Sequence, residues 1–386
     1  MELFVRRRIS VHIEAQRQKF PVLAVTGPRQ SGKTTLLKSL FPNYEYVSLE
    51  NPNIRAFAEE DPVAFMAEYA SNVIFDEVQR TPQLFSYIQT AVDESGQMGQ
   101  FILSGSQNFH LLRSITQTLA GRVALFKLLP LDFQELNASG MLLTKYTEAA
   151  VRGFYPALFH RDIDSTVFYA NYVQTYIEKD VTELIHVKDM QVFRTFLGLC
   201  ATRAGQLLNI NALANECDIA HATAKAWMSI LESSYIIFRL YPYHENFGKR
   251  LVKTPKLYFY DTGLLCHLLG ISGGLELNRL KGNIFENMVV AEFHKANQHL
   301  YQHRQYYFWQ DSNANEVDIL NKTADGFRIY EVKATQTISR DLFKGLDRFG
   351  DVAAPAPVEK TLIYGGGENQ RRTNYRVLSW QHIGAD

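Results

Sequence analysis

The chain has 386 residues, of which 46% are hydrophobic, and it carries 40 basic and 40 acidic side chains. This length predicts two or three domains with packed cores. A formal net charge of zero gives no support to a broadly basic nucleic-acid surface but leaves room for local patches. No apolar run approaches the 18 residues of a membrane-spanning helix, so we expect no membrane partner. The three isolated cysteines predict reduced, buried thiols and a cytoplasmic protein: Cys200, Cys217 and Cys266.

A phosphate-binding loop is predicted between an apolar strand at 21–25 and a helix at 35–40. The intervening G-P-R-Q-S-G-K-T fits the pattern G-x-x-x-x-G-K-[ST] at every fixed position. We expect Lys33 to reach the β- and γ-phosphates of ATP and the Thr34 hydroxyl to bind Mg²⁺. Arg29 is expected to face solvent or to pair locally. The predicted nucleotide-binding residues are Gly27, Pro28, Arg29, Gln30, Ser31, Gly32, Lys33, Thr34 and Thr35.

A second acidic element follows at 72–77, where a short apolar strand ends in Asp76 and Glu77. Taken alone, a strand that ends in Asp-Glu is more often an ordinary solvent-exposed strand end than part of a functional site. Downstream of a phosphate-binding loop it predicts that Asp76 holds the Mg²⁺ water shell and that Glu77 polarises the attacking water. A third strand at 101–104 leads into Ser106 and Gln107, which we predict to sense the γ-phosphate.

Arg122, in the segment L-A-G-R, has two interpretations that the sequence leaves open. It is either an arginine finger that completes the catalytic site of a neighbouring subunit or a surface arginine in a salt bridge. The first interpretation makes Arg122 catalytic together with Lys33 and Glu77, and it requires a homo-oligomer.

Strand and helix signals alternate through about residue 135, which predicts an α/β fold with a parallel sheet and helices on both faces. The last strand of this sheet is expected at 127–133. We predict three domains: a P-loop ATPase domain at 1–135, a helical and winged-helix region at 136–275, and an α/β nuclease-like domain at 276–386.

The winged-helix prediction rests on a short helix at 211–216, a turn, a longer helix at 221–232 and a strand at 234–240. The second helix begins with His221, Thr223, Lys225 and Trp227, where base or phosphate contacts would lie. Only Lys225 is a clear cation there. DNA recognition and a purely structural role in packing or subunit contact therefore both stay open.

The last third of the chain predicts a second acidic site. Glu286 lies on an amphipathic helix, Asp318 is expected to end a strand at 315–320, and a strand at 327–333 ends in Glu331-x-Lys333. Asp318 and Glu331 would coordinate a second Mg²⁺ or Mn²⁺, and Lys333 would orient a water molecule on the same sheet face. This is the PD-(D/E)XK nuclease arrangement. An isolated E-x-K is common, and the ordered set indicates the fold more strongly than an active site.

Taken together, the chain resembles a large prokaryotic family of AAA-type ATPases in which a winged-helix region and a nuclease-like domain follow the P-loop domain. The motifs that carry the resemblance are GPRQSGKT, FDEVQ, LSGSQ, LAGR, YFYDTGL, GNIFEN, NEVDIL and YEVK. Asp261, in YFYDTGL, is expected to cap the helix that follows it. The resemblance implies ATP binding and hydrolysis in a ring or other oligomer, of which a hexamer is one arrangement.

Two functions therefore remain open from the sequence. The first is an AAA-type ATPase that couples nucleotide turnover to DNA binding or processing. The second is an ATP-dependent regulatory or interaction module whose nuclease-like domain is a docking platform that does not cleave. Intact Glu77 favours hydrolysis, and intact Asp318, Glu331 and Lys333 argue against simple decay of the nuclease site.

Overall fold

The computed structural model describes all residues except 1–4, 107–114, 116, 178–188, 245–252 and 386. The chain divides into two compact units. The first comprises residues 1–131, 233–235 and 298–302, and the second comprises residues 132–232, 236–297 and 303–386. The three domain boundaries expected from the sequence stay a prediction.

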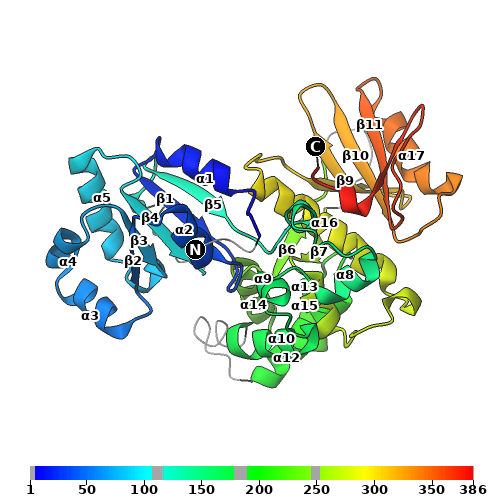
Figure 1. Ribbon diagram of the computed structural model, residues 1–386. Helices are drawn as coiled ribbons and strands as arrows, with labels where there is room; N and C mark the ends of the chain where they lie inside the picture. The colour runs from blue at the N-terminus through cyan, green and yellow to red at the C-terminus, as the bar shows by residue number, and fades with distance from the viewer. Residues whose placement is uncertain (1–4, 107–114, 116, 178–188, 245–252, 386) are drawn as a thin grey trace. The chain divides into compact units, whose positions relative to one another are not determined.

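The first unit is an α/β layer structure (Figure 1). Its elements are α1 (Ser10–Arg17), β1 (Val22–Thr26), α2 (Lys33–Leu40), β2 (Glu45–Ser48), α3 (Pro52–Glu60), α4 (Pro62–Glu68), β3 (Val73–Asp76), η1 (Val78–Arg80), α5 (Leu84–Ser95), β4 (Phe101–Gly105) and β5 (Val123–Lys127).

The five strands of this unit form one parallel sheet in the order β2-β3-β4-β1-β5. Because side chains alternate along a strand, the sheet has two apolar faces. Val22 and Ala24 of β1 belong to a core shared with α3, α4 and α5, whereas Leu23 and Val25 belong to a core shared with α1 and α2. The expected parallel sheet with helices on both faces is confirmed.

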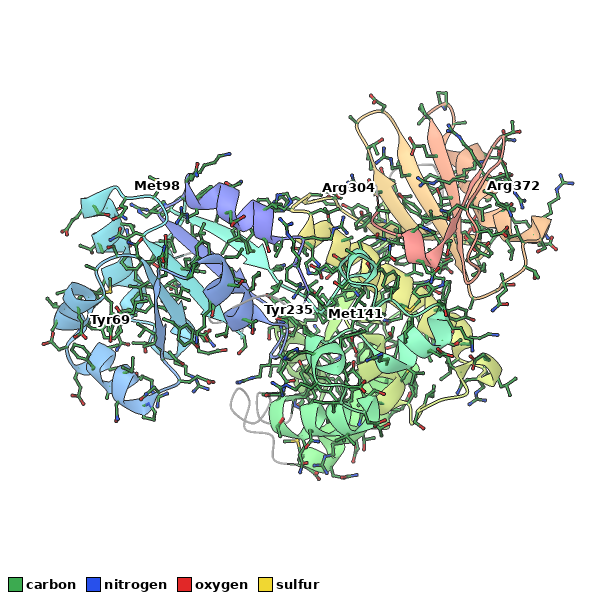
Figure 2. The ribbon with its side chains drawn as sticks, viewed as in Figure 1. Tyr69, Met98, Met141, Tyr235, Arg304 and Arg372 are labelled. Atoms are coloured by element: carbon green, nitrogen blue, oxygen red, sulfur yellow. The ribbon has the colours of Figure 1, made fainter. Side chains whose placement is uncertain are left out.

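Aromatic rings fill much of the core between the sheet and α3–α5. Tyr69, labelled in Figure 2, ends α4, and its ring centroid lies 4.7 Å from that of Phe65 and 6.3 Å from that of Phe75 in β3. All three side chains are buried. This packing fixes β3 against the helices, and β3 ends at Asp76, the first of the two acidic residues that the sequence singles out.

The last strand of the sheet differs from the prediction. It is β5 at Val123–Lys127 and not the segment 127–133. The apolar residues Leu128 and Leu129 are buried, but they lie in the connection after the strand. The prediction placed the strand too late in the sequence because it took their apolar character as a sign of a strand. The four-residue edge strand β2 was not predicted, since its pattern is short and half polar.

The second unit holds the remaining elements. They are α7 (Phe133–Ala138), α8 (Tyr146–Arg152), α9 (Pro156–His160), α10 (Ser165–Tyr172), η2 (Val173–Ile177), α12 (Met190–Thr202), α13 (Ile210–Glu216), α14 (His221–Ser233), β6 (Ile237–Leu240), β7 (Lys256–Phe259), α15 (Thr262–Leu268), η3 (Leu275–Leu277), α16 (Lys281–His299), β8 (Tyr307–Gln310), β9 (Glu316–Lys322), β10 (Phe327–Lys333), η4 (Arg340–Phe343), α17 (Lys344–Ala353), β11 (Val358–Tyr364), β12 (Gln370–Arg371), β13 (Arg376–Ser379) and η5 (Trp380–His382). Within the described ranges, no helix has both the length and the apolar character that crossing a membrane requires.

The helices predicted at 211–216 and 221–232 are present as α13 and α14, and the antiparallel pair β6–β7 follows them. One expectation about α14 was wrong. Trp227 is only 5% exposed, and its ring packs edge-on against Phe193 and Phe196 of α12. It is a core residue, because its position on the helix faces α12. His221 and Lys225 are exposed.

A six-stranded mixed sheet in the order β12-β13-β11-β10-β9-β8 forms the end of the chain. Strand β10 is parallel to β11 and antiparallel to β9. One apolar core contains Val317, Ile329 and Leu362 from these strands together with Leu346 and Phe349 from α17. Asp318 lies inside β9 and does not end a strand as expected, because β9 continues to Lys322.

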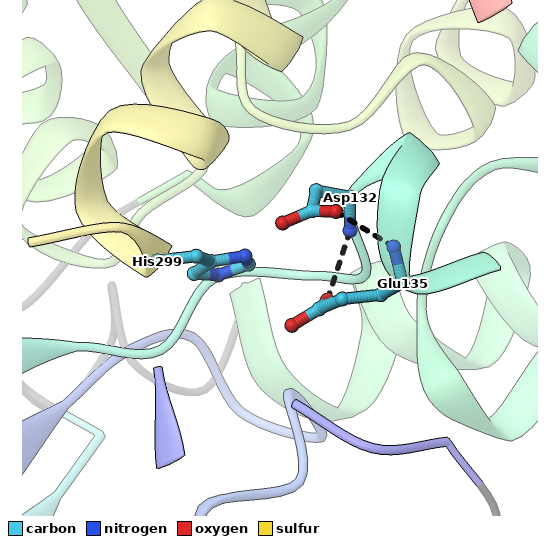
Figure 3. A group of neighbouring side chains, drawn as sticks. All are labelled: Asp132, Glu135 and His299. Atoms are coloured by element: carbon cyan, nitrogen blue, oxygen red, sulfur yellow. Dashed lines mark hydrogen bonds between the residues drawn. The ribbon is translucent and has the colours of Figure 1, made fainter. Parts of the chain in front are cut away.

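Buried carboxylates cap helices in this unit. Asp132 accepts a hydrogen bond of 2.9 Å from the Glu135 backbone at the start of α7, and Glu135 accepts one of 3.1 Å from the Asp132 backbone (Figure 3). Asp261 caps α15, as predicted, by accepting a 3.0 Å bond from the Leu264 backbone. It also accepts bonds from the Phe154 backbone (2.8 Å) and the Tyr169 hydroxyl (2.6 Å).

We expect Asp261→Ala to lower the free energy of unfolding by about 3 kcal/mol or more, because it leaves buried donors on three different residues without an acceptor. The matched control is Asp164→Ala, which removes the exposed cap of α10 and should cost about 1 kcal/mol. Urea denaturation of both variants measures the difference. Equal losses would contradict the role assigned to Asp261.

Candidate nucleotide site and C-terminal carboxylate cluster

The predicted phosphate-binding loop connects β1 to α2 and requires its glycines. Gly27 has φ of 155°, and a Cβ there would lie 2.1 Å from the Leu128 carbonyl oxygen. Gly32, at the N-cap of α2, has φ of 92°, in the range that favours glycine. The loop therefore leads directly into the start of α2, where the first backbone N–H groups of a helix lack intrahelical acceptors and the helix dipole favours an anion.

Lys33 is the first residue of α2, and its ammonium group lies within this loop. Nζ donates 2.9 Å hydrogen bonds to the carbonyl oxygens of Gly27 and Pro28, and the residue is 6% exposed. These contacts hold a cation where the loop's backbone N–H groups converge. The arrangement suits phosphate oxygens.

Asp76 is the centre of a hydroxyl network at the end of β3. Its carboxylate accepts hydrogen bonds from Thr34 Oγ1 (2.9 Å), from the Tyr46 hydroxyl (2.5 Å) and from Ser104 Oγ. Burial, and next the Asp76 hydrogen bond and charge, raise the pKa of Tyr46 well above its usual range, so Tyr46 stays a donor. Since Thr34 donates its hydrogen to Asp76, its oxygen lone pairs remain available, and the two residues offer the hard oxygen donors that Mg²⁺ prefers.

Glu77 follows Asp76 with a left-handed backbone, φ of 55°. Its Oε2 accepts hydrogen bonds from Ser106 Oγ (3.0 Å), from the Ser106 backbone (3.3 Å) and from Gln79 Nε2. Among the described residues, no hydrogen bond reaches Oε1. These three hydrogen bonds fix the position of Glu77 Oε2. Ser106 contacts Glu77, and its role as a γ-phosphate sensor stays a prediction. Gln107 lies outside the described residues.

A small group of charged side chains includes Arg29 of the phosphate-binding loop. Arg29 NH1 and Arg80 NH2 lie 3.9 Å and 3.7 Å from Glu50 Oε1. Arg29 therefore contacts a local carboxylate. The remaining residues of the predicted set, Gln30, Ser31 and Thr35, lie in the loop and the first turn of α2.

Arg122 lies where the parallel strands begin, whereas the loop lies where they end. It directly precedes β5, and its carbonyl accepts a bond from the Val22 backbone at the start of β1. The five residues of β1 separate it from the loop by roughly 15 Å at about 3.3 Å per residue. Its guanidinium forms a two-pronged ion pair with Asp93, with distances of 2.5 and 2.8 Å. Arg122 is therefore outside its own nucleotide site.

The predicted C-terminal residues do come together. Lys333 Nζ lies 2.6 Å from Glu331 Oε1 and 3.9 Å from Asp318 Oδ2, and the Val332 backbone donates a 2.8 Å bond to Asp318. Glu286, on α16, lies near Asp318. Burial, and next the charge of Asp318, raise the pKa of Glu331 to about 8. Glu331 Oε2 is buried and has no hydrogen-bond partner among the described residues.

Three further residues join this cluster, and the sequence analysis missed them: Lys256, Tyr258 and Glu316. Lys256 Nζ contacts Glu286 Oε1 at 2.9 Å and forms an ion pair with Glu316, and the Tyr258 hydroxyl donates to Glu286 at 2.7 Å. Glu286, Glu316 and Asp318 each offer one oxygen within 4.8 Å of the others. We call the six charged residues of this group the carboxylate cluster: Lys256, Glu286, Glu316, Asp318, Glu331 and Lys333.

Comparison with protein families divides the chain into three matched segments. The family described as AAA domain matches residues 19–137. Residues 143–274 match a domain of unknown function, DUF8612, and residues 281–383 match another, DUF4143. The first match agrees with the parallel sheet and the loop geometry, so this part of the chain has the P-loop fold of an AAA-type ATPase domain.

Several proteins are similar to this chain. An uncharacterized protein of Mycobacterium tuberculosis is 29% identical over 352 residues, which are 89% of this chain and 78% of the relative. An uncharacterized protein of Haemophilus influenzae is 25% identical over 199 residues, 48% of this chain and 49% of the relative.

Among solved structures, the Walker-type ATPase paby2304 of Pyrococcus abyssi is 14% identical with a TM-score of 0.43, covering 69% of this chain and 96% of that one. DnaA from Aquifex aeolicus is 15% identical with a TM-score of 0.31, covering 58% and 85%. At these scores the likenesses add nothing to the assignment made from the chain itself.

Proposed function

We propose that this protein binds ATP with Mg²⁺ in the loop at Gly27–Thr34 and hydrolyses it, with Glu77 accepting a proton from the attacking water. The observation that carries the proposal is the convergence of Lys33, Thr34, Asp76 and Glu77 at one edge of the parallel sheet. The match of residues 19–137 to the AAA domain supports it.

The chemistry follows from the positions of these groups. Lys33 and the loop backbone bind phosphate oxygens, while Thr34 and Asp76 would hold Mg²⁺, which neutralises phosphate charge when bound. Glu77 Oε1 accepts one proton from water as the water oxygen bonds to the γ-phosphorus and the bond to the ADP oxygen breaks. Ser106, bonded to Oε2, keeps that carboxylate in place.

Replacing Lys33 by Ala should abolish nucleotide binding, whereas Glu77→Gln should keep binding and lower turnover by about 10²–10⁴. The matched controls are Lys19→Ala and Glu59→Gln, which change exposed residues of the same unit. Nucleotide titration and phosphate release measure the two effects. Full turnover in Glu77→Gln would show that Glu77 is not the base.

We further propose that the active form is a homo-oligomer, with a hexameric ring as one arrangement, in which Arg122 acts on the nucleotide of a neighbouring subunit. The position of Arg122 at the far edge of its own sheet supports this, because only another subunit could present a γ-phosphate there. The ion pair with Asp93 would have to open, and an exposed pair opens at little cost.

Arg122→Ala should lower hydrolysis by about 10³ or more, the usual effect of losing an arginine finger. Mixing it with Lys33→Ala subunits should restore part of the activity, since each variant supplies what the other lacks. Asp93→Asn is the control, because it breaks the same ion pair and keeps the guanidinium. Normal hydrolysis by Arg122→Ala would place the finger elsewhere.

We propose DNA as the partner of this ATPase, on the support of α13, α14 and the β6–β7 pair, whose second helix exposes His221 and Lys225. The test is ATP hydrolysis by the purified protein with single-stranded, duplex and branched DNA at two salt concentrations. Stimulation that weakens at higher salt supports DNA coupling. Unchanged hydrolysis with every DNA favours the regulatory or interaction module.

For the carboxylate cluster, we propose a divalent cation site formed by Asp318, Glu331 and the neighbouring carboxylates, in a domain that resembles PD-(D/E)XK nucleases. The four carboxyl groups outnumber the two lysines, and Glu331 Oε2, which has no hydrogen-bond partner among the described residues, offers a further oxygen. The second candidate function, a docking platform that does not cleave, is favoured by the position of Lys256 among the ligand oxygens.

Millimolar Mn²⁺ or Mg²⁺ should stabilise the nucleotide-free protein by about 1.4 kcal/mol at tenfold excess over Kd, and Asp318→Asn should abolish the effect. Glu359→Gln, an exposed residue of β11, is the control. Thermal unfolding measures the stabilisation. If no divalent ion shifts the unfolding temperature, the site does not exist.

Cleavage is a separate question for the same cluster. Metal-dependent DNA cleavage that is lost in both Asp318→Ala and Lys333→Ala would establish a nuclease. Metal binding without cleavage of any DNA tested would favour the docking platform.

A further inference from the structure

Lys256 occupies the middle of the carboxylate cluster. Its Nζ lies 2.9 Å from Glu286 Oε1 and in direct contact with Glu316 Oε1. These two side chains and Asp318 are the three whose oxygens approach within 4.8 Å of one another. The ammonium group therefore contacts two of the three carboxylates that could coordinate a divalent ion.

Burial and charge hold the ammonium there. Lys256 is 5% exposed, and an isolated buried ammonium would be strongly unfavourable. Two carboxylates in contact with it compensate this cost. The Lys256 ammonium occupies oxygen atoms of Glu286 and Glu316. It also repels an incoming cation, because like charges a few ångströms apart interact strongly in a buried site.

Lys256 does not belong to the elements that supply the carboxylates. It begins β7, whereas Glu316 and Asp318 lie in β9 and Glu286 in α16. Strand β7 pairs with β6, and the Leu257 and Gly205 backbones are joined by a 2.8 Å hydrogen bond just before α13 begins. The position of the ammonium is thus fixed by the strand pair and the helices next to it.

We propose that Lys256 is a built-in competitor for the divalent cation, so that the cluster binds a metal more weakly than its carboxylates would without the ammonium. This inference rests on the cation site proposed above. The Lys256 ammonium, which β7 positions, therefore lowers the affinity of the nuclease-like domain for a metal in the protein as it stands.

The test is Mn²⁺ binding to the nucleotide-free, full-length protein, followed by the electron paramagnetic resonance signal of free Mn²⁺. Lys256→Met keeps the length of the side chain and removes its charge, and it should bind Mn²⁺ at least about tenfold more tightly than wild type. Lys344→Met, in the exposed first turn of α17, is the matched control and should leave the affinity unchanged. Adding Asp318→Asn to Lys256→Met should abolish the gain.

Lys256→Gln guards against a folding defect, because the amide can still donate hydrogen bonds to Glu286 and Glu316, and it should also tighten Mn²⁺ binding. Unchanged or weaker binding in both Lys256 variants, with binding lost in Asp318→Asn, would overturn the competitor and keep the cation site. Binding that none of these substitutions changes would overturn the cation site itself.

Discussion

The parallel direction of the five N-terminal strands is the constraint on which the nucleotide site depends. Because all five run the same way, the residues that follow β1, β3 and β4 meet at one edge of the sheet. The glycine loop, Asp76 and Ser106 are brought together by this topology although they are far apart in the sequence. Strand β4 lies between β1 and β3, so Ser104 at its end contacts Asp76 and Ser106 just after it contacts Glu77.

The same constraint separates Arg122 from this edge. A residue that precedes a parallel strand must lie at the opposite edge, so Arg122 cannot serve its own site without rearrangement of the sheet. If Arg122 is catalytic, the active protein must therefore be an oligomer. If the protein acts as a monomer, Arg122 is a surface residue paired with Asp93.

The features of the fold and the sites that could be predicted from the sequence are those that short stretches of neighbouring residues determine. The loop, Asp76 and Glu77 follow from short motifs, since adjacent residues and one strand direction determine their geometry. Tyr46 and Lys256 could not be found in this way. Tyr46 lies in a short edge strand with no motif, and Lys256 reaches Glu286 and Glu316 only through tertiary packing of β7. The predicted end of the sheet failed for a related reason, because Leu128 and Leu129 are apolar without being in a strand.

We propose above all that Asp76 and the Thr34 hydroxyl form a Mg²⁺-dependent ATP site. The decisive measurement is calorimetric titration of ATP into wild type and Asp76→Asn, each with and without Mg²⁺. Mg²⁺ should strengthen ATP binding in wild type and not in Asp76→Asn, while binding without Mg²⁺ should be similar in both. A Mg²⁺ effect of equal size in the two proteins, or no ATP binding by wild type, would contradict it.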